Sequence, residues 1–202
     1  MPRTREFDRT AVLDKAMHAF WEGGYRATSL DHLLAATGLS KSSLYDTFGG
    51  KQALLLECLD AYGRQLFAGP IEPLLRVDAA FDDIREVFTR ILAHAATPAG
   101  RRGCLANTCI GELGGRDAAV SAATGAIVER IESGFAAAVA TAQARGEITN
   151  PESPAVLARF LFNTLSGLNL AARAGASHER LHDIVRVTLD ALAPAPAVAH
   201  TE

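Results

Sequence analysis

The most reactive side chains in this sequence are three cysteines and six histidines. An odd number of cysteines without a Cys-x-x-Cys pair supports neither a disulfide framework nor a structural zinc site. His178 and His182 lie four residues apart, but such a pair near a helix start is more often solvated than bound to metal. The remaining catalytic candidates match no known nucleophile or metal pattern in their spacing: His94, Cys104, Cys109, Glu112, His178 and His182. We therefore predict no enzyme, no metal and no cofactor.

Cys104 is the one cysteine whose sequence setting favours reactivity. Arg101 and Arg102 precede it, and Gly103 would leave it in the first turn of a helix. Nearby cations and unpaired helix amides both stabilise a thiolate, so this setting predicts a lowered pKa and a sensor of oxidants or electrophiles. The alternative is an inert packing group, which describes most buried cysteines.

A second kind of chemistry, the binding of phosphates and base edges, is concentrated between Thr28 and Lys51. Thr28 can cap a short helix whose leucines recur at helical spacing, and Gly38 ends that helix because glycine readily adopts the left-handed conformation. Ser40 can then cap a second helix after a single intervening residue. Two short helices joined in this way form a helix-turn-helix.

The second helix of this motif carries the predicted binding face. Leu44 and Phe48 are four residues apart and are expected to face inward. Serine hydroxyls and a lysine at a helix N-terminus suit contacts with phosphates and base edges, because they bond without bulk and the exposed amides favour anions. The predicted DNA-binding residues are Thr28, Ser40, Lys41, Ser42, Ser43, Tyr45, Thr47 and Lys51.

Residues 24–30, 36–48 and 51–55 together resemble the TetR family of one-component bacterial transcriptional regulators. The resemblance covers about the first third of the chain in one continuous register, which is more specific than an isolated motif. It implies a homodimer that binds a palindromic double-stranded operator, most often as a repressor, and responds to a small-molecule effector. It also implies an N-terminal tail that sometimes reaches the minor groove, for which Arg3, Arg5 and Arg9 are the candidates. A frayed, solvated tail is the alternative.

Length and composition favour two all-helical units. A chain of 202 residues with many alanines and leucines has room for a small N-terminal module and a larger domain. We predict a DNA-binding domain at residues 1–66, built as a three-helix unit, and a ligand-binding and dimerisation domain at residues 67–202. No export signal is apparent, and the longest uncharged run, 160–172, is too short to span a bilayer. We therefore expect a cytoplasmic protein that does not bind membranes.

Net charge argues against binding that is driven by bulk electrostatics. The chain carries a formal net charge of −3, and residues 1–51 hold seven Lys and Arg against six Asp and Glu, a balance of +1. Few phosphates can be neutralised by one copy. DNA binding would then depend on placed contacts and on two copies acting together.

Apolar periodicity beyond the motif predicts further helices at 51–67, 78–96, 101–113, 117–145, 155–175 and 178–193, in addition to one at 9–22. The segment after Pro194 is predicted to be disordered. Two strongly apolar terminal helices, paired with two from a second copy, would form a four-helix dimer interface, although they could instead close a monomeric core. The predicted dimer residues are Phe160, Leu161, Leu165, Leu168, Leu181, Ile184, Val185 and Leu189.

Polar side chains inside otherwise apolar helices suggest a ligand cavity in the larger domain. Such groups are costly to bury unpaired, so they either satisfy one another or line a pocket. The predicted ligand-binding residues are Phe88, Leu92, Cys104, Asn107, Thr108, Phe135, Phe162, Asn163 and Ser166. The competing hypothesis for the whole chain is a helical small-molecule-binding or redox-sensing protein whose helix-turn-helix is only structural.

Overall fold

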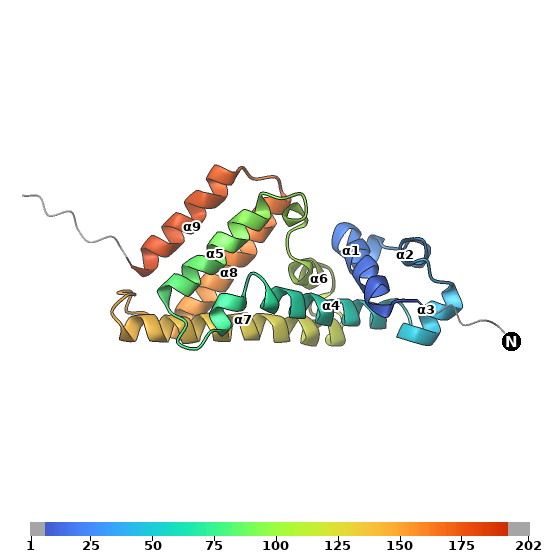
Figure 1. Cartoon of the computed structure of the whole chain (residues 1–202), viewed down its shortest axis with the longest axis horizontal. Helices are drawn as coiled ribbons and strands as arrows, with labels where there is room; N and C mark the ends of the chain where they lie inside the picture. The colour runs from blue at the N-terminus through green and yellow to red at the C-terminus, as the bar shows by residue number, and fades with distance from the viewer. Residues whose placement is uncertain (1–6, 194–202) are drawn as a thin grey trace, which may run out of the picture. The chain divides into compact units, whose positions relative to one another are not determined.

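A computed structural model describes residues 7–193 and shows an all-α architecture without strands in that range, which confirms the predicted fold class (Figure 1). Arg3, Arg5 and the segment after Pro194 lie outside the described residues. The elements are α1 (Arg9–Ala27), α2 (Leu30–Thr37), α3 (Lys41–Phe48), α4 (Lys51–Ala68), the 3-10 helix η1 (Glu72–Leu75), α5 (Phe81–Ala95), the 3-10 helix η2 (Gly100–Arg102), α6 (Leu105–Leu113), α7 (Ala118–Ala144), α8 (Pro154–Arg173) and α9 (His178–Leu192).

The helices form two compact units that do not follow the chain in two simple halves. The first unit combines residues 1–65 with residues 104–127, and the second combines 66–103 with 128–202. The first unit therefore contains α6 and the start of α7 in addition to α1–α3 and most of α4. The predicted boundary at residue 66 assigns residues 104–127 to the other domain. The predicted division of function between the two domains stays a prediction.

In the first unit, α1 packs against α2 and α6. Its buried stripe includes Met17 and Phe20, each 1% exposed. Trp21 meets Tyr62 of α4 edge to face, with ring centroids 5.0 Å apart, an arrangement that aromatic pairs prefer. α1 is longer than the predicted 9–22 helix because it continues past a kink at Gly24.

In the second unit, α5 packs against η1, α8 and α9. Phe88 of α5 and Phe135 of α7 are both 0% exposed and stack with ring centroids 6.1 Å apart. Serines cap the last two helices: the Ser153 hydroxyl accepts from Val156 N and the Ser177 hydroxyl accepts from Arg180 N.

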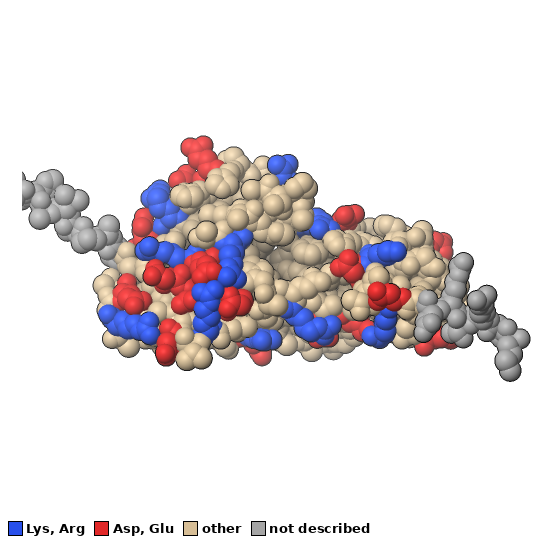
Figure 2. All heavy atoms as spheres, in the orientation of Figure 1, with Lys and Arg blue, Asp and Glu red and all other residues tan. Residues whose placement is uncertain are grey.

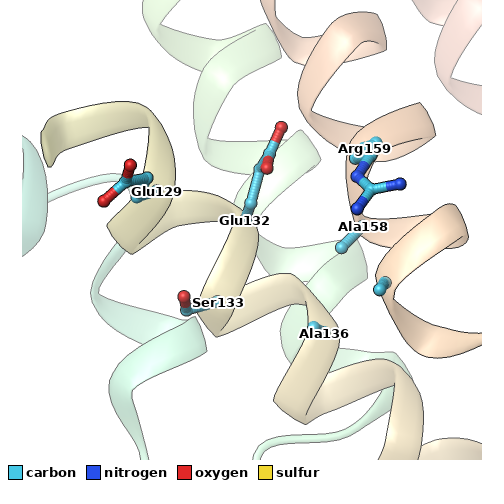
Figure 3. Close-up of a pocket in the computed structure, with 7 residues that line it drawn as sticks. Glu129, Glu132, Ser133, Ala136, Ala158 and Arg159 are labelled. Carbon is cyan, nitrogen blue, oxygen red and sulfur yellow. The ribbon is translucent and has the colours of Figure 1, made fainter. Parts of the chain in front are cut away.

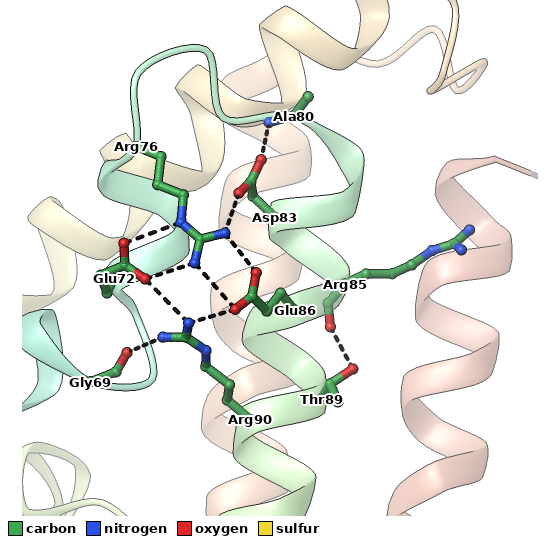
Figure 4. A network of polar contacts seen from close by, with 9 residues as sticks. All are labelled: Gly69, Glu72, Arg76, Ala80, Asp83, Arg85, Glu86, Thr89 and Arg90. Atoms are coloured by element: carbon green, nitrogen blue, oxygen red, sulfur yellow. Dashed lines mark hydrogen bonds and ion pairs between the residues drawn. The ribbon is translucent and has the colours of Figure 1, made fainter.

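A surface network of ion pairs ties η1 to α5 (Figure 4). The Arg76 guanidinium bonds to Glu72 at 2.9 Å, to Asp83 at 3.0 Å and to Glu86 at 2.6 Å. Arg90 extends the network, because its guanidinium bonds both Glu86 and the Gly69 carbonyl. Isolated surface pairs contribute little, but a guanidinium held by three carboxylates holds η1 in place relative to α5.

Candidate nucleic-acid interface

The helix ends and the cap of the helix-turn-helix lie where the sequence predicts them. Gly38 ends α2 with φ of 75°, and Gly49 ends α3 with φ of 80°, both in the left-handed region where a side chain would be strained. The Ser40 hydroxyl caps α3 by accepting from Ser43 N at 3.1 Å. Leu44 is 0% exposed and Phe48 is 4% exposed, so one face of α3 is fixed against the unit's core.

The opposite face of α3 is free to meet a ligand. Lys41, Ser42, Tyr45 and Asp46 are exposed on it, with Tyr45 at 49%. Lys41 occupies the first helical position, where a cation opposes the helix dipole, so its placement does not serve helix stability. Asp46 was not among the predicted contacts. The one sequence feature that could have identified Asp46 as a contact is its position next to Tyr45. Its carboxylate oxygens can accept a hydrogen bond from a cytosine amino group.

The remaining predicted contact residues differ in how available they are. Ser43 and Thr47 are half-buried beside the exposed face. Ser40 is exposed, but its hydroxyl is engaged as the cap and lies within 3.0 Å of the Ser42 hydroxyl and 2.8 Å of the Ser43 hydroxyl. Thr28 is 0% exposed and its hydroxyl donates to Gly24 O at 2.6 Å. Thr28 therefore holds the chain before α2 and does not face a ligand, which corrects its assignment. It does not cap α2 either, because the Ser29 hydroxyl accepts from His32 N.

Two cations are engaged within the unit. The Lys51 ammonium lies 4.2 Å from the centre of the Tyr25 ring, and burial lowers the Lys51 pKa while Glu112 opposes that change. Arg9 bonds Glu57 with both carboxylate oxygens at 2.6 and 2.8 Å and stacks over Phe48. In this structure Arg9 therefore packs α1 against α4 and α3, and its minor-groove contact stays a prediction.

Charge on the visible face of the molecule is mixed. Figure 2 shows Lys and Arg side chains among Asp and Glu rather than gathered in one basic patch, as the net charge of −3 suggests. This distribution agrees with binding through a few placed contacts.

Cys104 differs from its prediction. It is the N-cap residue of α6, which begins at Leu105 and not at residue 101 as predicted. The backbone amides of Ala106 and Asn107, at the start of α6, favour its thiolate. Tyr62 Oη donates to Cys104 Sγ at 3.2 Å. These donors favour the thiolate, but burial outweighs them and raises the Cys104 pKa. The predicted lowering of its pKa is thus wrong, because a sequence does not show how completely a thiol is desolvated.

The other two cysteines are buried thiols. Burial is the main cause that raises the pKa of Cys109 to about 12, and it raises the Cys58 pKa as well. The described residues contain no group of three or more His, Cys, Asp and Glu side chains that could hold a metal ion. His178 and His182 are exposed, with ring centroids 6.3 Å apart.

The predicted ligand-binding residues fall into both units. Cys104, Asn107 and Thr108 belong to the first unit, whereas the six others belong to the second. Asn163 is exposed and donates to the carbonyl of Arg159 one turn earlier, which explains its place on an apolar helix without a cavity. The ligand-binding role of the set stays a prediction.

One hollow of about 360 Å³ lies between α7 and α8 and contains none of the predicted ligand residues. Figure 3 shows Glu129 and Glu132 on the α7 side and Arg159 on the α8 side. It is open to solvent, and its lining carries both signs of charge.

The predicted dimer residues lie on two different faces of α8 and α9. Five of them are buried inside the single chain and so cannot meet a partner: Leu161, Leu165, Leu168, Leu181 and Val185. The apolar side chains that do reach the surface are Val156 and Phe160 at 43%, Leu170 at 68% and Val187 at 57%. Of these four only Phe160 was predicted, and the predicted Ile184 and Leu189 are half-buried, because periodicity identifies an apolar stripe but not which stripe its own chain covers.

α8 also has the length and apolar composition of a membrane-spanning helix, with 33% of its most apolar window buried inside the chain. A core helix of a water-soluble protein has the same properties. The helix predicted at 155–175 agrees with α8 to within two residues at each end, and Pro154 opens it at the first helical position.

Comparison with known proteins supports a regulatory identity. Residues 12–58 match the family described as "Bacterial regulatory proteins, tetR family", and residues 80–188 match "Tetracyclin repressor-like, C-terminal domain". The chain is 36% identical to the HTH-type transcriptional repressor ComR of Escherichia coli K12, over 93% of this chain and 90% of ComR. It is 30% identical to the HTH-type transcriptional regulator YezE of Bacillus subtilis 168, over 95% of this chain and 100% of YezE.

Among solved structures, a cysteine mutant of the regulator CifR in complex with 26 base pairs of operator DNA aligns with a TM-score of 0.81 and 30% identity. The alignment covers 94% of this chain and 99% of that chain. These matches favour a DNA-binding function over the alternative in which the helix-turn-helix is only structural.

Proposed function

The chain belongs to the TetR family of bacterial regulatory proteins, and from this membership we propose that it is a homodimeric repressor whose operator complex is released by a small molecule. It is a ligand-responsive, DNA-binding transcriptional regulator. We assign it no enzymatic role and place it in the cytoplasm, where the DNA is. A palindromic operator follows from two-fold symmetry, because each copy presents one α3 to one half-site.

The observation that carries this proposal is the exposed face of α3. Lys41 and Tyr45 protrude from a helix whose other side is held by Leu44 and Phe48 and whose ends are fixed by caps. Such a helix enters a major groove as a rigid body and loses little conformational freedom on binding. Ser42 and Asp46 complete the face. The Ser42 hydroxyl can bond a phosphate or a base, and the Asp46 carboxylate can accept from a donor on a base edge.

The dimer is proposed to form through the exposed stripe of α8 and α9. Val156, Phe160 and Leu170 recur at helical spacing along α8, and Val187 exposes a similar side chain on α9. A second copy placed on this stripe would remove it from water in a symmetric interface. This also accounts for the low burial of α8 within a single chain.

The proposal is tested by fluorescence anisotropy of labelled DNA from upstream of the protein's own gene, titrated with the purified chain at several salt concentrations. We expect saturable binding with a stoichiometry of two chains per palindrome and an affinity that falls linearly with salt on a logarithmic scale. Scrambled DNA of equal length is the control. Equal affinity for scrambled and upstream DNA would reject a repressor of its own promoter region, and a screen of genomic fragments would then decide whether any operator exists.

A further inference from the structure

The helix α1 breaks at Gly24, three residues after the only tryptophan of the chain. Gly24 has φ of 76° and ψ of 169°, a backbone conformation essentially restricted to glycine. A side chain at this position would also overlap Glu112 Oε1, which comes from α6. The backbone conformation requires a glycine here, and a Cβ would in addition displace the carboxylate of Glu112, a residue 88 positions later in the chain.

The Glu112 carboxylate also bonds the backbone just after the kink. Its Oε2 accepts from Arg26 N at 2.8 Å, two residues after the kink. Charge on the acceptor makes this bond stronger than one between neutral groups. We call the contact of Glu112 with Gly24 and Arg26 the Gly24–Glu112 joint.

A short chain of contacts connects this joint to the DNA-reading helices. The Gly24 carbonyl accepts from the Thr28 hydroxyl at 2.6 Å, and the same hydroxyl lies 3.2 Å from Ala19 O. Ser29 follows directly and caps α2 by accepting from His32 N at 3.1 Å. The start of α2, and with it the turn that leads to α3, is thus set by backbone that Glu112 holds.

The other end of α6 is attached to α4. Cys104 is the N-cap of α6 and accepts from Tyr62 Oη at 3.2 Å. α6 has nine residues, and at 1.5 Å per residue it spans about 13 Å as one rigid element. A displacement at its Cys104 end would therefore reach the joint without being absorbed by a flexible loop.

A second acidic contact lies beside the joint. Asp117, which precedes α7, accepts from Gln52 Nε2 at the start of α4. Glu112 itself lies close enough to Lys51 to favour its charged form, and Lys51 covers the Tyr25 ring. The segment 24–26 is therefore held by a carboxylate from α6 on one side and by α4 on the other.

We propose that Glu112 is a positioning residue for DNA reading, which sets the orientation of α2 and α3 through the Gly24–Glu112 joint and transmits movements of α6 to them. This inference rests on the proposed function, since it assigns to α6 the control of operator affinity. The unit's core is already closed by apolar contacts such as Trp21 with Tyr62. The joint is thus available to control orientation without being needed for folding.

The first experiment compares Glu112→Ala and Glu112→Gln with Glu129→Gln, an exposed carboxylate of α7, as the control for lost charge. Glu112→Ala should weaken operator binding at least tenfold with the thermal midpoint little changed. Glu112→Gln keeps an acceptor for Arg26 N and should lie between Ala and wild type. Operator affinity of Glu112→Ala equal to that of Glu129→Gln would overturn the proposal.

A double-mutant cycle then tests whether the two sides of the joint act together. Gly24→Ala should weaken operator binding by itself, because its side chain displaces the carboxylate. In the Glu112→Ala background the same substitution should cost clearly less, since the carboxylate that it displaces is already gone. Fully additive losses would mean that Gly24 and Glu112 act separately, and the proposal would fall.

Measurements without DNA separate failure of this inference from failure of the proposed function. In Glu112→Ala, the Arg26 amide should lose hydrogen-exchange protection and Trp21 emission should shift, whereas Glu129→Gln should leave both unchanged. A wild-type protein that binds no operator would reject the proposed function while these two readouts still test the joint. An unchanged Arg26 amide in Glu112→Ala would reject the joint even if operator binding is strong.

Discussion

Individual side chains on α3 divide between those that build the helix and those that are left for a partner. Leu44 and Phe48 are buried in the core and the Ser40 hydroxyl caps the helix, whereas Lys41 is exposed at the first helical position. A cation in the first turn of a helix opposes the helix dipole, so its presence there is a local cost. Local costs of this kind concentrate at functional sites.

Lys41→Ala should therefore weaken operator binding by about 1–3 kcal/mol and reduce the slope of log affinity against log salt by about one. Thermal unfolding should hardly change, because Lys41 contributes nothing to the core. Lys15→Ala, which removes an exposed lysine from α1, is the matched control. A salt slope equal to that of wild type would show that Lys41 does not neutralise a phosphate.

Cys104 should behave as a slow thiol. Burial raises its pKa above the ordinary value of about 8.5, so little thiolate exists at pH 7 and alkylation should accelerate only as pH rises beyond that value. The Tyr62 hydroxyl works in the opposite direction, so Tyr62→Phe should raise the pKa further and slow alkylation at pH 8. The rate is followed by mass spectrometry of the Cys104 peptide, with Tyr25→Phe as control. If the alkylation rate of wild-type Cys104 reached half its maximum below pH 8.5, Cys104 would be a reactive thiolate after all.

At the scale of elements, the link between η1 and α5 depends on charge. The Arg76 hydrogen bonds lower the pKa of Glu72 and Glu86 and are the largest cause in each case. A carboxyl whose folded pKa is lowered stabilises the fold above its unfolded pKa, near 4.3 for Glu, and loses that contribution as pH falls through the folded value. Arg76→Ala should lower the thermal midpoint at pH 7 and low salt.

The difference in midpoint between Arg76→Ala and wild type should then shrink as pH is lowered below about 4.3, where the carboxylates become protonated. Arg85→Ala is the control, because Arg85 lies on the same helix and stacks over Phe81 instead. A difference that stays constant from pH 7 to pH 3 would assign the effect to lost packing of the Arg76 stem rather than to its charge.

The sequence was sufficient for the local elements and insufficient for their partners. Gly38 and Ser40 predicted the turn and the cap of the motif correctly, because each acts on its immediate neighbours. The roles of Thr28 and Cys104 were misjudged, because both depend on burial by distant segments. Glu112 was considered only as a catalytic candidate, since nothing in the local sequence shows that its carboxylate meets Gly24.

At the scale of the whole molecule, the exposed stripe of α8 and α9 predicts where two copies meet. Leu170 is 68% exposed, whereas Leu168 on the same helix is 2% exposed. Leu170→Glu should give a folded monomer by sedimentation, with helical circular dichroism retained and operator affinity reduced. Leu168→Glu should unfold the chain instead, because a carboxylate would be buried without a partner. A Leu170→Glu protein that remains dimeric would move the interface to another face.

The discontinuous make-up of the first unit affects how the protein is made. A ribosome delivers residues 1–65 well before residues 104–127, yet both are parts of one compact body. The Glu112 carboxylate can bond Arg26 N only after α6 has been synthesised, so the orientation that we propose it sets for α2 and α3 is reached late in synthesis. Each newly made copy would thus bind operator DNA well only after α6 is in place. Truncated products that lack α6 would have little chance to occupy an operator.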